Sequence, residues 1–269
     1  MVEEPHKCKH VKKTPSTFLG VLFICSIQLI YAQEVVPRKG ETVFEDKFKR
    51  GLNAGWTWVR PEASAYKIGF KGLLMRSLDG NIWGGQTSGR NFLLRMLPHL
   101  EEGVMTEVSL KSTPTGPFEQ AGLIWYHSDG KYIKLVVESF NGERIVNMVR
   151  EENDNATIFK QGLVDKASKP LAISFKDNKA VLIDKTTNRE AEVDLNKVVA
   201  ERIGLRLLVD SGNVVGQMRE AGKKEWKTIA RCPSLNEANL RVGFVTLMGS
   251  KEGAKWVEFD KFVIRKTKF

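Results

Sequence analysis

The stretch FEQAGLIWYHSDGKYIKLVVE, residues 118–138, decides the fold class of this 269-residue chain. Two runs rich in apolar residues flank the pair Asp129-Gly130. An Asp-Gly pair favours the positive φ angles of a type I′ turn, which joins adjacent antiparallel strands. After the turn, one face carries Tyr132, Lys134, Val136 and Glu138, and the other carries Ile133, Leu135 and Val137. This alternation with a period of two predicts a β-hairpin.

The rest of the chain repeats short apolar-rich segments between turn residues. Asn141-Gly142, Asp177-Asn178 and Ser211-Gly212-Asn213 are further turn signals. The other predicted strands are 43–48, 56–59, 73–76, 92–97, 104–111, 144–150, 172–175, 180–183, 205–209, 214–218, 226–230, 240–248 and 256–264. One helix is predicted over 195–202, with Asp194 as its N-cap. Strands this short and closely spaced predict an all-β fold of two antiparallel sheets.

The first 32 residues have the features of a signal peptide. Basic residues precede the apolar segment 18–30, and the small residue Ala32 ends a plausible cleavage site. This apolar segment is shorter than the about 20 residues that span a bilayer, and an uncleaved N-terminal anchor is the alternative. We expect a signal peptide over 1–32, a linker over 33–41 and one domain over 42–269. The expected protein is secreted, extracellular or periplasmic, and makes no membrane contact after cleavage.

The composition is that of a globular protein without disulfide bonds. Hydrophobic residues make up 42% of the chain, charged residues 28%, and the net charge is +10. Basic and acidic residues are interleaved, so the charge does not favour nucleic acid as a partner. Cys8 and Cys25 lie in the signal segment, which leaves Cys232 alone in the processed chain. We expect Cys232 to be a buried, small apolar side chain rather than a nucleophile.

Several sequence blocks together resemble a known family. The blocks are FEDKF at 44–48, WTWVRP at 56–61, the stretch 118–138, LRLLVDSGNVVGQMREAGKKEWKTI at 205–229 and LRVGFVTLMGSKEGAKWVEFDKFVI at 240–264. Their order resembles the concanavalin A-like domain at the C-terminus of family 43 β-xylosidases. It also resembles stand-alone relatives of unknown function, which include a fungal protein described as a regulator of enolase.

The resemblance implies a two-sheet jelly-roll sandwich whose first and last strands lie side by side. It also implies a domain that accompanies carbohydrate-active enzymes. The chain has no room for the catalytic propeller of the xylosidases, so the resemblance does not imply their hydrolytic activity. The segment 169–193 is longer than the usual pattern, which indicates an inserted hairpin.

Sugar binding requires aromatic side chains that stack on sugar rings, with amide and charged partners for the hydroxyl groups. The candidate residues are Trp56, Trp58, Trp83, Arg90, Glu119, Gln120 and Trp125. Trp56 and Trp58 share one strand face, whereas Trp125 and Tyr126 point to opposite faces. Core packing is the alternative for each tryptophan. Trp83 lies in a glycine-rich loop, and we expect it to be the most exposed.

Hydrolysis of a glycosidic bond requires two carboxyl groups about 5–10 Å apart across a cleft. The strand carboxylates Glu107, Glu119, Glu138 and Asp260 are the available pairs if two of them share a concave face. Domains of the resembled kind often hold a structural calcium ion between their terminal strands. The candidate ligands are Glu45, Asp46 and Asp260. The alternative for Asp46 and Asp260 is hydrogen bonding within the strand pair.

These observations predict a secreted carbohydrate-binding or accessory module that acts on extracellular polysaccharide without catalysis. The expected partner is a polysaccharide or oligosaccharide, and the one cofactor considered is the structural calcium ion. Two alternatives stay open: a small glycoside hydrolase or lyase with paired carboxylates, and a protein-interaction module.

Overall fold

The computed structural model describes residues 40–98, 103–165, 167–210, 212–253 and 255–267. The predicted signal peptide and most of the predicted linker lie outside these residues. Seventeen β-strands and two short 3-10 helices form the described part of the chain. No helix in these residues is long and apolar enough to cross a membrane.

The strands follow one another with short connections, and their bounds are listed here in chain order. The first nine are β1 (Thr42–Asp46), β2 (Thr57–Val59), β3 (Tyr66–Gly69), β4 (Gly72–Arg76), β5 (Phe92–Met96), β6 (Val104–Lys111), β7 (Gln120–Ser128), β8 (Lys131–Phe140) and β9 (Glu143–Glu152). The others are β10 (Asn155–Gln161), β11 (Ser168–Lys176), β12 (Lys179–Asp184), β13 (Arg202–Asp210), β14 (Asn213–Glu220), β15 (Lys227–Pro233), β16 (Arg241–Leu247) and β17 (Trp256–Lys266). The 3-10 helices are η1 (Ala63–Ala65) and η2 (Trp83–Gly85).

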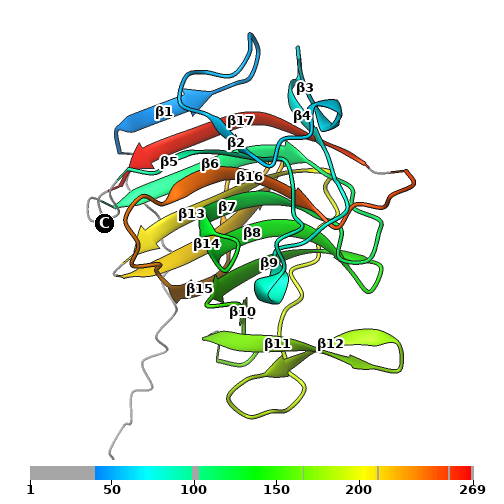
Figure 1. The fold of residues 1–269 in the computed structure, drawn as a ribbon. Helices are drawn as coiled ribbons and strands as arrows, with labels where there is room; N and C mark the ends of the chain where they lie inside the picture. The colour runs from blue at the N-terminus through cyan, green and yellow to red at the C-terminus, as the bar shows by residue number, and fades with distance from the viewer. Residues whose placement is uncertain (1–39, 99–102, 166, 211, 254, 268–269) are drawn as a thin grey trace, which may run out of the picture. The chain divides into compact units, whose positions relative to one another are not determined.

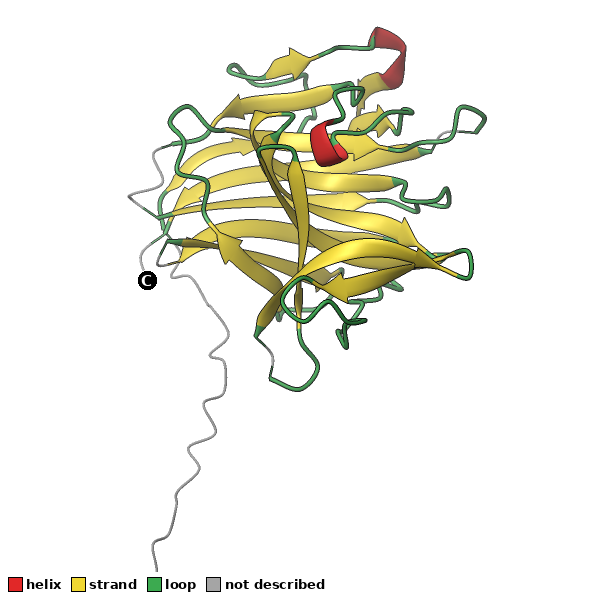
Figure 2. Cartoon of the chain, turned by 60° about the horizontal axis from the view of Figure 1, so that its bottom comes forward, coloured by secondary structure: helices red, strands yellow, loops and turns green. Residues whose placement is uncertain are grey.

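These strands form two antiparallel sheets that stack face to face (Figure 1, Figure 2). The eight-stranded sheet has the order β15-β14-β13-β6-β17-β4-β3, with β1 paired to β17. The nine-stranded sheet has the order β12-β11-β10-β9-β8-β7-β16-β5-β2. The β1–β17 pair confirms that the first and last strands lie side by side. The predicted two-sheet sandwich of the concanavalin A-like type is therefore confirmed.

The main core lies between the two sheets. Its members from the nine-stranded sheet include Leu123, Trp125, Leu135 and Phe244, and those from the eight-stranded sheet include Val108, Leu205, Phe259 and Phe262. Cys232 is 1% exposed and belongs to the same core, which confirms the expectation that it is buried. Burial raises the pKa of its thiol to about 12, so the thiolate of Cys232 is strongly disfavoured.

The nine-stranded sheet has a second face, which turns away from the eight-stranded sheet and is called the outer face below. The predicted alternation of β8 is confirmed, because Ile133, Leu135 and Val137 join the core between the sheets. Tyr132 and Val136 join a second apolar cluster on the outer face. Ile82 beside η2 and residues 191–195 also pack in this cluster. Much of the outer face is therefore covered by chain rather than exposed to solvent.

The hairpin at 118–138 forms, but its turn differs from the predicted type I′. Neither Asp129 nor Gly130 has a positive φ angle, and the ladder shifts register between Tyr126 and Ser128. The carboxylate of Asp129 accepts hydrogen bonds from the Arg60 guanidinium at 2.9 and 2.8 Å and from the Tyr126 hydroxyl at 2.9 Å. These side-chain bonds and the bulge shape the turn. Asn141-Gly142, in contrast, has the positive φ angles of 51° and 79° that a type I′ turn requires.

Two expectations concern the segment between β10 and β13. The hairpin expected within 169–193 is present as β11 and β12, which extend the nine-stranded sheet. The predicted helix over 195–202 is wrong, because the chain is irregular there until β13 begins at Arg202. The carboxylate of Asp194 accepts the backbone N–H of Asn196 at 2.7 Å, in a local turn rather than a helix cap.

Candidate functional site

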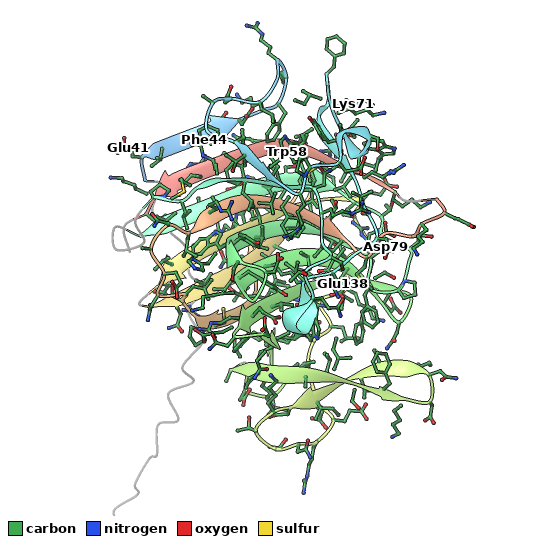
Figure 3. All side chains as sticks on the ribbon, in the orientation of Figure 1. Glu41, Phe44, Trp58, Lys71, Asp79 and Glu138 are labelled. Carbon is green, nitrogen blue, oxygen red and sulfur yellow. The ribbon has the colours of Figure 1, made fainter. Side chains whose placement is uncertain are left out.

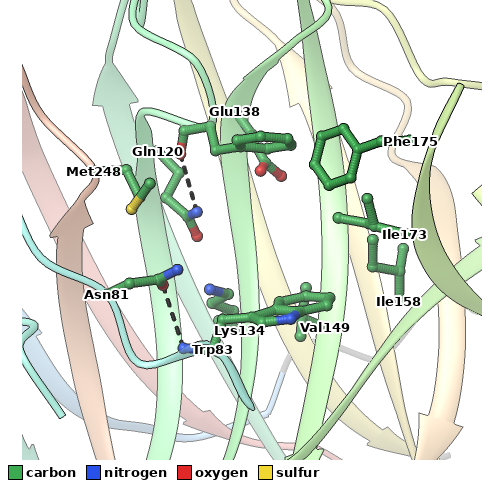
Figure 4. A pocket seen from close by; sticks show the side chains of 11 residues that line it. Asn81, Trp83, Gln120, Lys134, Glu138, Val149, Ile158, Ile173, Phe175 and Met248 are labelled. Atoms are coloured by element: carbon green, nitrogen blue, oxygen red, sulfur yellow. Dashed lines mark hydrogen bonds between the residues drawn. The ribbon is translucent and has the colours of Figure 1, made fainter. Parts of the chain in front are cut away.

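A cavity of about 250 Å³ opens on the outer face of the nine-stranded sheet (Figure 4). Side chains from β7 to β11, from η2 and from three connecting segments line it. They are Asn81, Trp83, Phe118, Gln120, Lys134, Glu138, Val149, Ile158, Ile173, Phe175 and Met248. In Figure 3, Glu138 lies on the side of η2, away from Phe44 and Trp58.

The strand β8 places one cation and one anion in this cavity. Lys134 and Glu138 are 1% and 6% exposed, and the period of the strand puts both on the outer face. Asn147 donates a hydrogen bond to the Glu138 carboxylate. The Nζ atom of Lys134 has no hydrogen-bond partner among the described residues, and Lys134 and Glu138 form no ion pair within 4.0 Å there. The two opposite charges therefore share the cavity without neutralising each other directly.

Burial controls the protonation of these groups. It lowers the pKa of Lys134 to about 8, although the nearby Glu138 and Glu151 carboxylates favour the charged form. Burial also raises the pKa of Glu138, while Lys134, Asn147 and Lys160 oppose that rise. Lys160 lies behind the cavity, where its Nζ donates to the carbonyls of Val146 and Leu195 at 3.2 and 3.3 Å.

A buried amide adds a third polar group to the cavity. The Gln120 side chain is 4% exposed, and its Nε2 donates to the carbonyl of Phe118 at 3.1 Å. Its Oε1 has no hydrogen-bond partner among the described residues. Buried polar atoms are nearly always hydrogen-bonded, so this oxygen and the Lys134 ammonium are two exceptions in the lining of one cavity.

Two walls of the cavity are held by strained backbone. Phe118 and Met248 have φ angles of 59° and 57°, in the left-handed region that large side chains rarely adopt. The N–H of Phe118 donates to the carbonyl of Ser139, and that of Met248 to the carbonyl of Gly80. Such strain costs about 1–3 kcal/mol per residue and clusters at functional sites. It supports a functional role for the cavity.

The segment around η2 forms a third wall of the cavity, and hydrogen bonds to side chains of the sheet hold it in place. Trp83 is half-buried, and its N–H donates to the Asn81 Oδ1 atom at 3.3 Å. The Tyr132 hydroxyl lies 3.3 Å from the carbonyl of Ile82 and 3.2 Å from the Glu151 carboxylate. The backbone of η2 also hydrogen-bonds to Glu151, whose pKa burial raises. These bonds fix the Trp83 ring at the edge of the cavity.

A family model now identifies the fold. The model of the β-xylosidase C-terminal concanavalin A-like domain matches residues 45–181, which is just over half of the chain. The chain belongs to this family. All lining residues of the cavity except Met248 fall within the matched residues.

Solved structures of the family show the same fold at low sequence identity. The GH43 BlXynB protein from Bacillus licheniformis matches with a TM-score of 0.58 and 16% identity over 82% of this chain and 39% of its own. A xylan β-1,4-xylosidase from Bacillus halodurans C-125 matches with a TM-score of 0.59 and 14% identity over 87% of this chain and 41% of its own. The chain thus spans about two fifths of these proteins. No curated protein sequence matches it.

Within this family fold, two of the sugar-binding candidates predicted from the sequence line the cavity, namely Trp83 and Gln120. Trp125 is fully buried between the sheets, where its Nε1 donates to Thr106 Oγ1 at 2.9 Å. This corrects the expectation for Trp125, because a ligand cannot reach it. The prediction that Trp125 and Tyr126 point to opposite faces is confirmed.

The other candidates lie outside the cavity. Trp56 packs on Phe244 and Phe262, and Trp58 stacks on Tyr66 with ring centres 4.2 Å apart. The two remaining candidates, Glu119 and Arg90, make contacts with nearby parts of the chain. Glu119 accepts the backbone N–H groups of Thr115 and Gly116 at 2.8 and 3.1 Å, and exposed Arg90 lies 3.6 Å from Glu62. These four side chains serve packing and local structure in this fold.

The expected calcium ligands do not gather at one point. Asp46 accepts hydrogen bonds from Phe48 N, Asn53 N and Trp56 Nε1 at 2.8 to 2.9 Å. Glu45 pairs with Lys47 and Lys261, and Asp260 pairs with Arg202. The described residues contain no group of three or more acidic, histidine or cysteine side chains that could hold a metal ion. The side-chain hydrogen bonds of Asp46 and Asp260 go to partners outside the β1–β17 pair, so they differ from the alternative as well.

The strand carboxylates considered for hydrolysis are dispersed. Glu107 pairs with Arg219 and Arg265 on the eight-stranded sheet. Glu138 is the one carboxylate among the described residues that line the cavity. The geometry of the cavity therefore does not supply the paired carboxyl groups of a glycosidase.

Phe118, Lys134, Glu138 and Phe175 are among the cavity residues that the sequence reasoning did not name as binding candidates. A signal for two of them was present, because Lys134 and Glu138 are charged residues on one strand face of a long apolar-rich hairpin. No sequence pattern indicated Phe175, because its position depends on how the β11–β12 hairpin joins the sheet.

Proposed function

We propose that this chain is a secreted, non-catalytic accessory module that binds carbohydrate in the cavity on its outer face. The observation that carries the proposal is the pair Lys134 and Glu138, buried in one cavity without an ion pair. A sugar hydroxyl both donates and accepts hydrogen bonds, so adjacent hydroxyls satisfy an ammonium and a carboxylate at once. The rings of Trp83, Phe118 and Phe175 provide apolar surfaces for the sugar ring.

The family relation supports carbohydrate as the ligand class. The matching family is named for β-xylosidases and one matched structure is a xylan β-1,4-xylosidase, so xylose-containing polysaccharides are the first ligands to test. A single cavity with a few hydrogen bonds gives weak binding, in the range of about −4 to −8 kcal/mol, or millimolar to micromolar Kd. Secretion is part of the proposal and rests on the signal-like segment 1–32.

Affinity electrophoresis and calorimetry test this function. The chain is run against xylan, arabinoxylan, xyloglucan, β-glucan and mannan, and saturable binding to at least one of them is expected. The variant K134M should weaken that binding at least about tenfold, because it removes the unpartnered donor. Retention by none of these polysaccharides would overturn the proposal.

The same samples also test for a catalytic role. A hydrolase or lyase releases new reducing ends, and the variant E138Q would abolish the release because Glu138 is the carboxylate at the cavity. We expect no release above the buffer control from any polysaccharide that binds.

A further inference from the structure

Side chains bound the cavity on several sides within the plane of the sheet. Asn81 and Trp83 stand on one side, and Phe175 and Ile173 of β11 on another (Figure 4). Met248, after β16, stands beside Gln120 in the same view. A polymer that passes through a binding site needs an entrance and an exit along the sheet. Walls on these sides, together with the small volume of the cavity, favour the entry of a chain end over the passage of a polymer.

The size of the cavity limits how much of a ligand enters. Its volume of about 250 Å³ lies below the roughly 300–1,000 Å³ of pockets that enclose drug-sized ligands. One sugar ring fits this space, and a row of several rings does not. The aromatic walls stand around the floor formed by β8 and β9, where Lys134 and Val149 lie.

The charges around the cavity balance. Lys134 and Glu138 are the two ionisable side chains among the described residues that line it. One cation and one anion give no net charge for an ionic sugar to offset. Desolvating a ligand carboxylate or ammonium without a net counter-charge is unfavourable by several kcal/mol. A neutral ring leaves this balance unchanged and avoids that penalty.

We propose that the cavity binds the terminal residue of a neutral saccharide chain, one ring deep. The inference rests on the proposed carbohydrate binding and names its ligand class. The module would thus locate chain ends, such as those that an endo-acting polysaccharide hydrolase creates.

The test measures Kd by calorimetry for xylose, glucose and arabinose and for their neutral oligosaccharides of two to six residues. We expect the Kd of the preferred series to change less than about threefold from two to six residues. Partial endo-hydrolysis of the bound polysaccharide should raise the amount of protein bound per unit mass in proportion to the number of new ends. Glucuronic and galacturonic acids should bind at least tenfold more weakly than the preferred neutral sugar.

Matched variants tie the result to the cavity. F175A removes one wall and should weaken the preferred sugar at least fivefold. F70A makes the same change at a residue that is 99% exposed on the β3–β4 turn, outside the cavity, and should leave Kd unchanged. Circular dichroism and thermal melts confirm that both variants fold.

The outcomes separate the two proposals. Affinity that climbs more than tenfold with chain length overturns end binding and leaves carbohydrate binding intact, and preference for a uronic acid overturns the neutral class in the same way. Binding that F175A and F70A change equally removes the cavity as the site. Binding of no saccharide overturns the proposed function itself.

Discussion

Lys134 is an unfavourable side chain to bury, and the fold compensates its charge only in part, through the Tyr132 ring 5.4 Å from Nζ and the nearby Glu138 and Glu151 carboxylates. Its Nζ atom makes no hydrogen bond to the described residues. An ammonium taken out of water costs several kcal/mol unless hydrogen bonds or a close counter-ion compensate. Stability alone would favour methionine, which has a similar length and no charge. The proposed ligand gives a reason for a lysine at this position that stability alone does not.

The double variant K134M/E138Q tests whether the two buried charges lower stability and are needed for binding. It removes both buried charges, keeps the volumes and leaves an acceptor for Asn147. We expect the free energy of unfolding at pH 7 to rise by about 1–4 kcal/mol, as when other buried ion pairs are replaced by neutral groups. We also expect saccharide binding to be lost. Urea unfolding with an unchanged m-value measures the first effect.

The rise in the free energy of unfolding expected for K134M/E138Q depends on pH through the pKa of Lys134. The pKa is about 8 in the folded chain, against an ordinary value of 10.5. Between these values the unfolded chain binds the proton and the folded chain does not, so the stability of the unmodified protein rises with pH. The advantage of K134M/E138Q should therefore be largest below pH 8 and shrink towards pH 10.5. Loss of stability in the variant at pH 7 would contradict this account.

A surface pair provides the control. Lys197 and Glu143 lie 2.9 Å apart with side chains 58% and 51% exposed. The variant K197M/E143Q removes the same two kinds of charge from solvent. It should change stability little, with no trend between pH 8 and pH 10.5, because exposed pairs are screened by water.

At the scale of elements, strand β8 shows what the sequence can and cannot predict. Its alternation identified the side chains that share a face, and the structure confirms that assignment. It did not predict that the outer face is covered. The covering segments, beside η2 and at 191–195, come from distant parts of the chain and have no periodicity. A pattern within one strand contains no information about what packs on it.

The turns show a similar limit. The Asn-Gly pair at 141–142 adopts positive φ angles, whereas the Asp-Gly pair at 129–130 does not. The difference arises from side-chain partners, because Arg60 and Tyr126 bind the carboxylate of Asp129. Arg60 lies 69 residues before Asp129, and no local rule includes it.

Asn141 couples its turn to the hairpin that walls the cavity. Its Nδ2 donates to the carbonyl of Ala180 at 2.6 Å, and its Oδ1 accepts the N–H of Ala180 at 3.0 Å. Ala180 belongs to β12, which pairs with β11, the strand that carries Phe175. These two hydrogen bonds attach the β11–β12 hairpin to the turn between β8 and β9.

The variant N141G should release that hairpin without disturbing the turn, because glycine accepts the φ angle of 51°. Two lost hydrogen bonds of about 0.5–1.5 kcal/mol each predict at least about fivefold faster amide exchange in β11 and β12. Saccharide binding should weaken as Phe175 becomes less fixed. Hydrogen exchange followed by mass spectrometry measures the first effect.

Asn178 supplies the matched control. It has a φ angle of 60° in the turn of the same hairpin, and its side chain is exposed. The variant N178G should leave exchange in β11 and β12 within a factor of about three. Equal acceleration in both variants would show that the Asn141 bonds do not anchor the hairpin.

For the whole molecule, the ordered blocks of sequence were enough to predict the sandwich and its adjoining first and last strands. They were not enough for the site. Trp125 and Trp83 are both tryptophans in plausible places, yet one lies in the core and the other at the cavity. The calcium prediction was limited in the same way, since Asp260 has Arg202 as its partner, 58 residues away in sequence. Long-range contacts decide which polar groups are free.

Cys232 reports whether this molecule opens as one unit. It is 1% exposed in the core that both sheets share, and burial raises its pKa to about 12. A thiol reagent reaches it only when the core opens. If opening is global, the labelling rate of the Cys232 peptide, followed by mass spectrometry, tracks the free energy of unfolding. The K134M/E138Q variant should then label about tenfold more slowly for each 1.4 kcal/mol of added stability. Equal labelling rates in both proteins would mean that β15, at the edge of its sheet, opens alone.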